Sequence, residues 1–510
     1  MNILKKMQNK FFTIRICVLA AGIIFYILPQ FTKEIEFFYV LSPWIYLTCF
    51  LYYTRTIERK RDWMIFLAAM LVGSEVRFRF FLGDYDLEIR IIAILLLIIV
   101  AAGFMIPFIC DKLYAASGGG TLAIVMFPLI RLLIEDVLYG QQFNLSLSQF
   151  GNKWLIQSEA LFGDRFISFM VALIPSVITY MIVKKNKTAF IRGGISLLLC
   201  ALIFAHGIFR YNHSRSFDKT IKMAYASGPQ KTYYEDPAKE DPSYQENAEY
   251  LRRTVKEAAE GGARLIAYAE EAFMTEGRDE NDGLVEEAMH AAQVNNICIL
   301  LCLDYLGESY FAENTAVLID QNGNYLSHYT KTNLIPVIET GTYEAGDGII
   351  PCNHITIDGQ DLAISYTICY DATFSDFLLT MDSETNLYIN PSWDWSEIVD
   401  LNYRMQGISA IQGGVVLFKP TVDGWSTVMD PYGRLHYKES TLRGDYNKVY
   451  FVDVPYGKAN SLYKKWHRQI ELIWSVLITI ALLNLAYICV IRIAGWVKNR
   501  RKKINSSNEK

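Results

Sequence analysis

Eight long apolar runs constrain this chain more than any other feature of its sequence. A helix needs roughly 20 mostly apolar residues to cross the hydrocarbon core of a bilayer. Seven such runs precede residue 210, and one more lies near the C-terminus. They lie near residues 12–29, 37–54, 63–80, 90–109, 120–139, 166–183, 193–209 and 470–491. The sequence therefore predicts a polytopic α-helical membrane protein with seven spans, a long intervening segment and an eighth span.

Charged residues interrupt the third and fifth runs. Glu75 and Arg77 fall in the third, and Arg131, Glu135 and Asp136 fall in the fifth. Arg131 and Glu135 are four residues apart, so they can pair on one face of a helix. We expect an internal pair or an interfacial position for these charges rather than a functional site.

The segment between the seventh and eighth runs differs sharply in charge from the rest of the chain. Residues 214–460 hold 38 Asp and Glu against 18 Lys and Arg, a net charge of −20. The remaining residues hold 15 acidic and 31 basic side chains, a net of +16, so the chain's −4 is the sum of two opposite parts. This pattern excludes a disordered chain, a collagen-like fibre and a wholly soluble enzyme. Basic residues beside apolar spans also favour a membrane surface over nucleic acid as their partner.

The basic residues predict the orientation. They cluster before the first run, after the second, after the sixth and after the eighth, and with eight spans these four places lie on one side. We expect a multi-pass cell membrane protein with both termini cytoplasmic and the acidic segment extracytoplasmic. A cleaved signal peptide is the competing interpretation of residues 1–30. No A-x-A-like site follows and six more spans do, so we expect the first span to be retained.

The acidic segment shows short apolar stretches separated by turn residues, which predict an α/β sheet with helices on its faces. We divide the chain into an N-terminal membrane domain (1–210), an extracytoplasmic α/β domain (211–465) and a C-terminal span with a basic tail (466–510). The predicted strands cover 222–226, 264–269, 297–303, 315–319, 361–368, 387–389 and 415–418, and the predicted helices cover 242–260, 282–295 and 401–412.

The nine cysteines do not predict a disulfide framework or a zinc site. Five lie in or beside apolar runs. Cys298 and Cys302 share one predicted strand, where four residues span about 13 Å and forbid a bridge. The sequence has no C-x-x-C and no H-E-x-x-H motif. We therefore expect no metal.

Three reactive residue types follow predicted strands. Glu270, with Glu271 beside it, ends the strand 264–269, Lys331 follows a strand, and Cys369 follows the strand 361–368. Such loops are where α/β folds carry reactive groups. Each residue alone is more often structural, because a lone Cys is usually a small buried side chain and a loop Lys or Glu is usually solvated. Together they supply a nucleophile, a base and a cation for an oxyanion.

At these residues the chain resembles the carbon–nitrogen hydrolase (nitrilase) superfamily, which has a Glu-Lys-Cys triad on an αββα sandwich. With its membrane spans it is similar to the apolipoprotein N-acyltransferases. The outer loop 143–163, with Gln149 and Gln157, also resembles that family. The matching motifs are Gly228-Pro229-Gln230, Asn314, Tyr329-x-Lys331-x-x-Leu334-Ile335-Pro336-x-x-Glu339, Gly346-Asp347-Gly348 and Ile368-Cys369-Tyr370.

The resemblance implies roles for these residues. Cys369 is the expected nucleophile, Glu270 the general base and Lys331 the stabiliser of the oxyanion. Glu339 and Tyr370 match positions that support the intermediate and shape the pocket. Trp393 and Trp395, and Tyr343 in the loop 341–345, are candidates for lids or lipid contacts, and a place in the core is an equal alternative for each.

The sequence also departs from the family pattern. Tyr268-Ala269-Glu270 stands where Trp-Pro-Glu is usual, which leaves Glu271 as an alternative base. Asp371 replaces a usual Glu after Cys-Tyr and is expected to support the site. Pro391 stands where an acidic residue is common, and Ser409 and Gln412 stand where Arg and Glu are common. These departures bear on the identity of the acyl acceptor more than on the formation of the thioester.

The implied activity is acyl transfer from a membrane phospholipid, through a thioester on Cys369, to the N-terminal amine of a lipoprotein. It requires no metal and no organic cofactor. Two alternatives stay open. One is a membrane-tethered amidase in which water resolves the thioester. The other is a catalytically inactive lipoprotein-binding protein.

Overall fold

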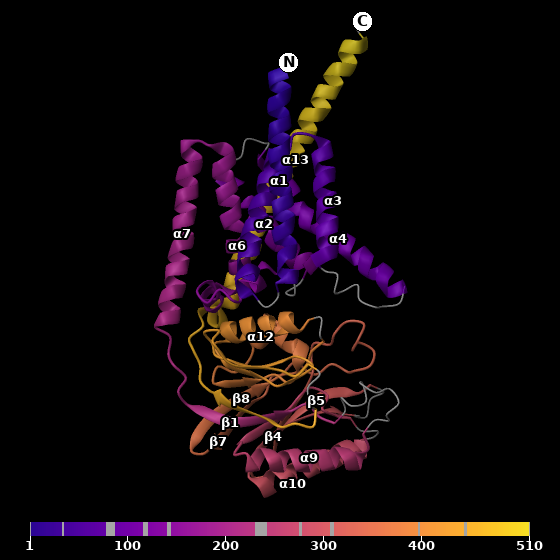
Figure 1. The fold of residues 1–510 in the computed structure, drawn as a ribbon, viewed down its shortest axis with the longest axis vertical. Helices are drawn as coiled ribbons and strands as arrows, with labels where there is room; N and C mark the ends of the chain where they lie inside the picture. Colours follow the sequence, from indigo (N-terminus) through magenta and orange to yellow (C-terminus); the bar gives the residue numbers. More distant parts are fainter. Residues whose placement is uncertain are drawn as a thin grey trace. The chain divides into compact units, whose positions relative to one another are not determined.

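The computed structural model separates into two compact units (Figure 1). The helical unit comprises Met1–Ser158, Phe162–Phe209 and Trp466–Lys510, and the α/β unit comprises Glu159–Leu161 and Arg210–Lys465. The structure describes residues 2–32, 35–77, 87–115, 121–139, 144–229, 242–274, 278–305, 311–395, 398–442 and 446–508.

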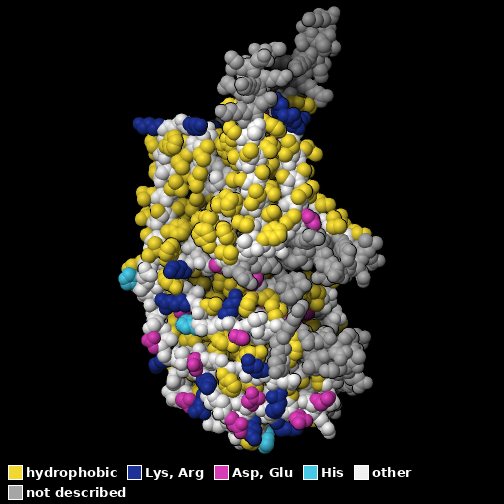
Figure 2. Space-filling model, in the orientation of Figure 1, with side chains coloured by type: hydrophobic (Ala, Val, Ile, Leu, Met, Phe, Trp, Pro, Cys, Tyr) yellow, Lys and Arg dark blue, Asp and Glu magenta, His cyan; other side chains and the backbone are white. Residues whose placement is uncertain are grey.

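Apolar helices, all long except α5, make up the helical unit. They are α1 (Asn2–Phe31), α2 (Glu36–Thr56), α3 (Lys60–Arg77), α4 (Leu87–Ala115), α5 (Met126–Ile134), α6 (Glu159–Lys184), α7 (Lys187–Asn212) and α13 (Leu462–Asn508). Hydrophobic side chains cover the visible surface of this unit (Figure 2).

Within the described residues, five segments are long and apolar enough to cross a membrane. They are Phe11–Phe31, Ile98–Ala115, Leu155–Lys184, Lys187–Asn212 and Leu462–Val497. Helix α2 contains the predicted run 37–54, and α3 contains the described part, 63–77, of the run 63–80, but neither helix is among these five. A helical membrane part is therefore supported, while the count of seven plus one spans stays a prediction.

The fifth predicted run, 120–139, is not one long helix. A 3-10 turn (Thr121–Ala123) precedes the nine-residue α5, and a π turn (Glu135–Tyr139) follows it. Nine residues rise only about 14 Å, which is too short to cross a bilayer core. Arg131 and Glu135 form the expected internal pair, with 3.0 Å between Nε and Oε1, and both are buried.

A second buried polar cluster joins α2, α4 and α6 within the helical unit. The Arg55 guanidinium donates to both carboxylate oxygens of Asp111, each at 2.8 Å. It also donates to the backbone and side chain of Ser176 and to Thr179. All five N–H groups of the Arg55 guanidinium therefore donate hydrogen bonds, and these bonds hold α2, α4 and α6 together.

The α/β unit contains two large sheets. The first has the strand order β15-β1-β2-β4-β5-β6, and β3 also pairs with β4. Strands β1, β2 and β4 are parallel to one another, while β5, β6 and β15 run antiparallel to their neighbours. The bounds are β1 Thr220–Ala226, β2 Leu265–Tyr268, β3 Phe273–Met274, β4 Cys298–Tyr305, β5 Glu313–Ile319, β6 Tyr325–Thr330 and β15 Tyr450–Pro455.

The second sheet has the order β14-β13-β11-β9-β8-β7. Strands β8, β9 and β11 are parallel, and β7, β13 and β14 run antiparallel to their neighbours. A short parallel pair, β10 with β12, stands beside it. The bounds are β7 Cys352–Ile357, β8 Gln360–Tyr366, β9 Leu387–Ile389, β10 Ser392–Trp393, β11 Val416–Lys419, β12 Thr421–Val422, β13 Trp425–Met429 and β14 Leu435–Ser440.

The two sheets face each other and helices cover their outer sides. Helices α9 (Tyr244–Glu260) and α10 (Arg278–Asn295) pack on the first sheet, and α12 (Val399–Gly413) packs on the second (Figure 1). Fully buried side chains of both sheets, such as Tyr225, Leu300 and Ile364, belong to one core cluster, and Tyr225 contacts Phe418 of the second sheet. The predicted αββα sandwich is therefore confirmed. Cys298 and Cys302 both lie on β4 and are free thiols, as the strand assignment predicted.

Candidate active site

The strand directions bring the predicted site residues to one edge of the sandwich. Strands β2 and β4 are parallel, so their C-terminal ends, with Glu270 just after β2 and Asp304 near the end of β4, lie at the same edge. Strand β5 runs the other way and begins there, with Asn314 opposite Asp304. Strand β6 reverses again and ends there, which places Lys331 beside them. In the second sheet, the parallel strands β8 and β9 end near Cys369 and Trp393 in the same way.

Lys331 is a fully buried cation held by two carboxylates. Its Nζ lies 2.7 Å from Oε1 of Glu270 and 2.5 Å from Oε1 of Glu339. The other oxygen of Glu339 accepts from the backbone N–H of Ile335 at 2.7 Å. Burial opposes the charge of Lys331, but the two carboxylates outweigh it, so the pKa of Lys331 lies well above its ordinary value. The ammonium is therefore a fixed positive charge.

Glu270 is oriented by hydrogen-bond donors on both oxygens. Oε1 accepts from Lys331 and from Nδ2 of Asn314 at 3.0 Å. Oε2 accepts from the backbone N–H of Trp393 at 2.8 Å. The side chain is only 3% exposed. Because all three partners donate, the arrangement suits a carboxylate acting as an acceptor.

Cys369 stands at the start of a 3-10 turn in a strained conformation. Its φ is +43°, in the left-handed region that L-residues other than Asn and Asp rarely adopt. Its N–H donates to the carbonyl of Pro391 at 2.8 Å, and its Sγ lies 3.7 Å from the carbonyl oxygen of Trp393. Burial raises the pKa of this thiol well above its usual value, and the charge of Glu270 and a hydrogen bond to it add to the shift. The thiol is therefore protonated at rest.

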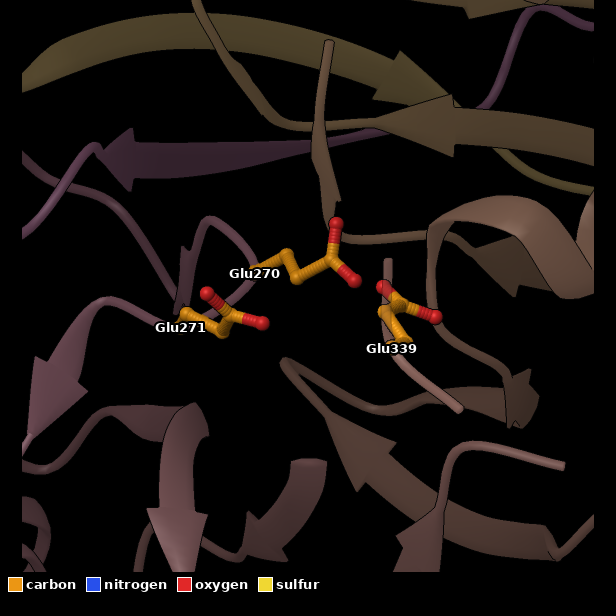
Figure 3. Close-up of side chains that lie close together, drawn as sticks. All are labelled: Glu270, Glu271 and Glu339. Atoms are coloured by element: carbon orange, nitrogen blue, oxygen red, sulfur yellow. The ribbon is translucent and has the colours of Figure 1, made fainter. Parts of the chain in front are cut away.

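Three glutamates lie close together beside Lys331, and two of them contact its ammonium. In Figure 3 the carboxylates of Glu271 and Glu339 lie on either side of Glu270. Oxygens of all three lie within 4.8 Å of one another, close enough to hold a metal ion. The ammonium of Lys331 already contacts Glu270 and Glu339, so the chain itself supplies a cation to these carboxylates.

Glu271 belongs to a different set of contacts from Glu270. Its backbone is also left-handed, with φ +52°, and its side chain accepts from Asn314 at 3.3 Å. The hydroxyl of Tyr343 lies near Glu271 and donates its one proton to Asp304 at 2.9 Å. Burial raises the pKa of Asp304 to about 7 and that of Glu271 well above its usual value. Among the described contacts, Glu271 has no hydrogen bond to Lys331 and Glu270 has one.

Asp371 ties two loops of the site together. Its carboxylate accepts from the Tyr329 hydroxyl at 2.8 Å and from the backbone and side chain of Asn333 at 2.7 and 2.8 Å. It is fully buried. Tyr370, in contrast, is partly exposed and packs edge-on against Phe374, with ring centroids 4.9 Å apart. Asp371 therefore supports the site from within.

Trp393 contributes mainly through its backbone, which contacts both Glu270 and Cys369. Its indole Nε1 donates to Asp423 at 3.3 Å. Sequence reasoning did not single out the buried Asp304, Asp394 or Lys419 as parts of this region. Asp304 follows a strand, as Glu270 does, so the strand-end criterion could have found it. Of the family-like motif at 228–230, Gln230 lies outside the described residues.

Comparison with known proteins gives one family match. Residues 236–408 match the carbon–nitrogen hydrolase family. A curated relative, the apolipoprotein N-acyltransferase of Rickettsia bellii, is 25% identical over 163 residues, which are 29% of this chain. The match spans only 32% of that relative's length.

Solved structures of amidases are also similar. An amidase from Nesterenkonia sp. matches 50% of this chain and 96% of its own, with 18% identity and a TM-score of 0.40. A mutant of the Nesterenkonia sp. AN1 amidase, with the acetamide moiety of fluoroacetamide added covalently to its active site cysteine, matches 50% and 97%, with 17% identity and a TM-score of 0.41. By the family match and the curated relative, residues 236–408 resemble the carbon–nitrogen hydrolases, and part of the chain resembles an apolipoprotein N-acyltransferase.

Proposed function

We propose that this protein is a membrane acyltransferase. It moves a fatty acyl chain from a phospholipid to Cys369 and then to the N-terminal amine of a lipoprotein. The convergence of Glu270, Lys331 and Cys369 in one buried site, within a chain that also carries long apolar helices, is the observation that carries the proposal. The curated relative named apolipoprotein N-acyltransferase supports it.

The first half of the reaction forms a thioester. The thiol is protonated at rest, so Glu270 accepts its proton as the sulfur attacks the ester carbonyl of the donor. Lys331 and a backbone N–H stabilise the oxyanion, each donor being worth about 3–4 kcal/mol. The N–H of Cys369 already donates to Pro391, so that of Tyr370 takes this role. The ester C–O bond then breaks, the lysophospholipid alkoxide takes the proton from Glu270, and the acyl group remains on sulfur.

The second half transfers the acyl group to an amine. Glu270, again ionised, accepts a proton from the amine as its nitrogen attacks the thioester carbonyl. Lys331 holds the second oxyanion in the same place. The C–S bond breaks, the proton returns to the sulfur, and the products are an N-acylated lipoprotein and free Cys369. The acceptor replaces the first product, so the scheme is ping-pong.

A membrane location fits the cost of moving the donor. Each CH₂ group transferred from the bilayer to water costs about 0.8 kcal/mol, so a long-chain donor is best used where it lies in the membrane. We place the α/β unit on the extracytoplasmic side, with both termini cytoplasmic, because the basic residues beside the apolar runs share one predicted side.

An amidase activity is the second candidate, because the matched family is that of the carbon–nitrogen hydrolases. In that case water resolves the thioester. The two activities differ in their products. Purified protein is incubated with phospholipid, its intact mass is measured, and a diacylated lipopeptide is added.

The proposal expects an acyl mass on Cys369 and then N-acyl lipopeptide. Cys369→Ala is expected to abolish both, while Glu→Gln at the exposed surface residue Glu249 serves as a matched handling control. Release of free fatty acid without acyl-peptide shows that water resolves the thioester, and release of ammonia from an added amide supports the amidase. The absence of an adduct with any phospholipid excludes the acyltransferase and leaves the binding-protein alternative.

A further inference from the structure

Another buried ion pair of the α/β unit lies one residue beyond Trp393. Nζ of Lys419 is 2.5 Å from Oδ2 of Asp394, and both side chains are fully buried. The other oxygen of Asp394 accepts from Nδ2 of Asn402 at 2.8 Å. Neither the triad chemistry nor the family-like motifs involve this pair. A pair of apolar side chains is often at least as stable in such a place, so the pair calls for a reason beyond stability.

The pair fastens one backbone segment to its neighbour. Lys419 ends β11, and Asp394 directly follows β10. The N–H of Ser392 donates to the carbonyl of Pro420, and the N–H of Asp394 donates to that of Val422, each at 3.0 Å. The ion pair and these backbone hydrogen bonds join the same two segments. Together they fix the register of residues 392–394 against 419–422.

That backbone segment contacts both reacting side chains. The N–H of Trp393 donates to Oε2 of Glu270 at 2.8 Å, and its carbonyl oxygen lies 3.7 Å from Sγ of Cys369. The carbonyl of Pro391 accepts from the N–H of Cys369 at 2.8 Å. A displacement of this segment therefore moves the base and the nucleophile at the same time.

Gly424 gives an independent indication that space is kept for the carboxylate. A Cβ at this position would lie 2.3 Å from Oδ2 of Asp394 and 2.7 Å from its Cβ. The backbone of Gly424 is not left-handed, since its φ lies outside the positive range. Glycine is therefore required here by the close approach of Asp394, and of the Thr421 methyl at 2.6 Å, rather than by backbone freedom.

We propose that Asp394 and Lys419 are positioning residues that hold the Trp393 backbone against Glu270 and Cys369, so that the proton can pass between them. The inference rests on the proposed roles of Glu270 and Cys369. It predicts that loss of the pair slows the chemistry at the thiol and leaves donor binding largely unchanged.

The test uses the full-length protein in detergent with two readouts. The first is the maximal rate of acyl-adduct formation on Cys369, together with the phospholipid concentration that gives half of that rate. The second is the rate at which iodoacetamide alkylates Cys369, followed by mass spectrometry of its peptide. Iodoacetamide is not a lipid, so this readout reports the thiol and its base even without acyl transfer.

Lys419→Met is expected to slow both reactions by about 10- to 100-fold, with the half-saturating concentration within about threefold. Lys419→Arg, which keeps the charge, is expected to restore most of the rate. Gly323→Ala is the matched control, because it strains a turn with φ +80° at the opposite end of β5 and its Cβ lies 2.6 Å from a backbone oxygen. It is expected to lower the unfolding temperature and leave both rates unchanged.

Unchanged rates in a folded Lys419→Met protein overturn the inference, and so does an equal loss in Gly323→Ala. If the single variant does not fold, Asp394→Leu with Lys419→Met removes both charges together, and the same rates are measured on it. If wild type forms no acyl adduct but alkylation still slows in Lys419→Met, the proposed function fails and the positioning role stands.

Discussion

The three glutamates of Figure 3 allow a sharp test of which carboxylate is the base. Each is changed to glutamine, which keeps the size and removes the charge. In Glu270→Gln the amide has one acceptor and one donor, whereas Glu270 faces donors on both oxygens: Lys331 and Asn314 on one and the Trp393 N–H on the other. In either orientation of the glutamine amide, its NH₂ group therefore faces an N–H donor and cannot accept from it.

The magnitudes follow from these contacts. A lost hydrogen bond to a charged group costs about 1.5–3 kcal/mol, which is about 10- to 150-fold in rate. Loss of the general base costs a further factor of about 10²–10⁴. Glu270→Gln is thus expected to slow thioester formation by about 10³–10⁶. Glu339→Gln weakens only the contact with the Lys331 ammonium, and it is expected to slow thioester formation by about 10- to 150-fold. Glu271→Gln is expected to stay within about tenfold of wild type, because its hydrogen bond from Asn314 is long, at 3.3 Å.

The assay is single-turnover formation of the acyl adduct on Cys369, quenched at increasing times and read by intact mass. Thermal unfolding in detergent verifies that each variant is folded. If Glu271→Gln is slower than Glu270→Gln, the base assignment is wrong. If Glu339→Gln is as slow as Glu270→Gln, the two carboxylates act only by holding Lys331, and the geometric reasoning is refuted.

Three further predictions concern stability, each measured by thermal unfolding of the full chain in detergent. The pKa of Asp304 is raised from 3.8 to about 7 by burial, so the folded protein keeps a proton that the unfolded chain has released, and stability falls as pH rises from about 4 to 7. Asp304→Asn should therefore gain stability over wild type at pH 8, by up to about 4 kcal/mol, and little at pH 4; a difference independent of pH contradicts this. Asp111→Asn should cost about 3–5 kcal/mol by leaving Arg55 poorly paired, whereas leucine at both positions should be close to neutral, and equal losses would count against the buried-pair argument. Gly414→Ala should cost about 1–3 kcal/mol, because φ is +69° and the new Cβ would lie 2.3 Å from the Ala459 oxygen, and a neutral result would contradict it.

The α/β layers could be predicted because continuous apolar strands alternate with helices in the sequence. The predicted strand 387–389 coincides with β9, and 264–269 contains β2. The edge strands were not predicted, because β7 and β14 are half exposed and lack a continuous apolar run. The run 120–139 holds two short turns around α5 rather than one long helix, and it contains the buried pair of Arg131 and Glu135 that their four-residue spacing predicted.

The candidate site could be predicted only in part. The strand-end positions of Glu270, Lys331 and Cys369 are visible in the sequence, and the structure brings the three together. The pair of Asp394 and Lys419 is not visible, because 25 residues separate its members and its meaning depends on the pairing of β10 with β12. Local patterns indicate which residues leave a strand, and only tertiary register shows which of them meet.

The pairing of β1 with β15 bears on how an insertion of this size is tolerated. Thr220 lies opposite Pro455, so the chain enters and leaves the α/β unit at adjacent backbone positions. Once that unit has folded, the link between α7 and α13 is effectively the short connections 213–219 and 456–461, joined across one strand pair. The entropic cost of closing a loop grows with the logarithm of its length. A flexible segment as long as the α/β unit would therefore cost about 2–3 kcal/mol more to close than these short connections. For the entropy of bringing α7 and α13 together, nearly half of the chain therefore counts only as a short connection.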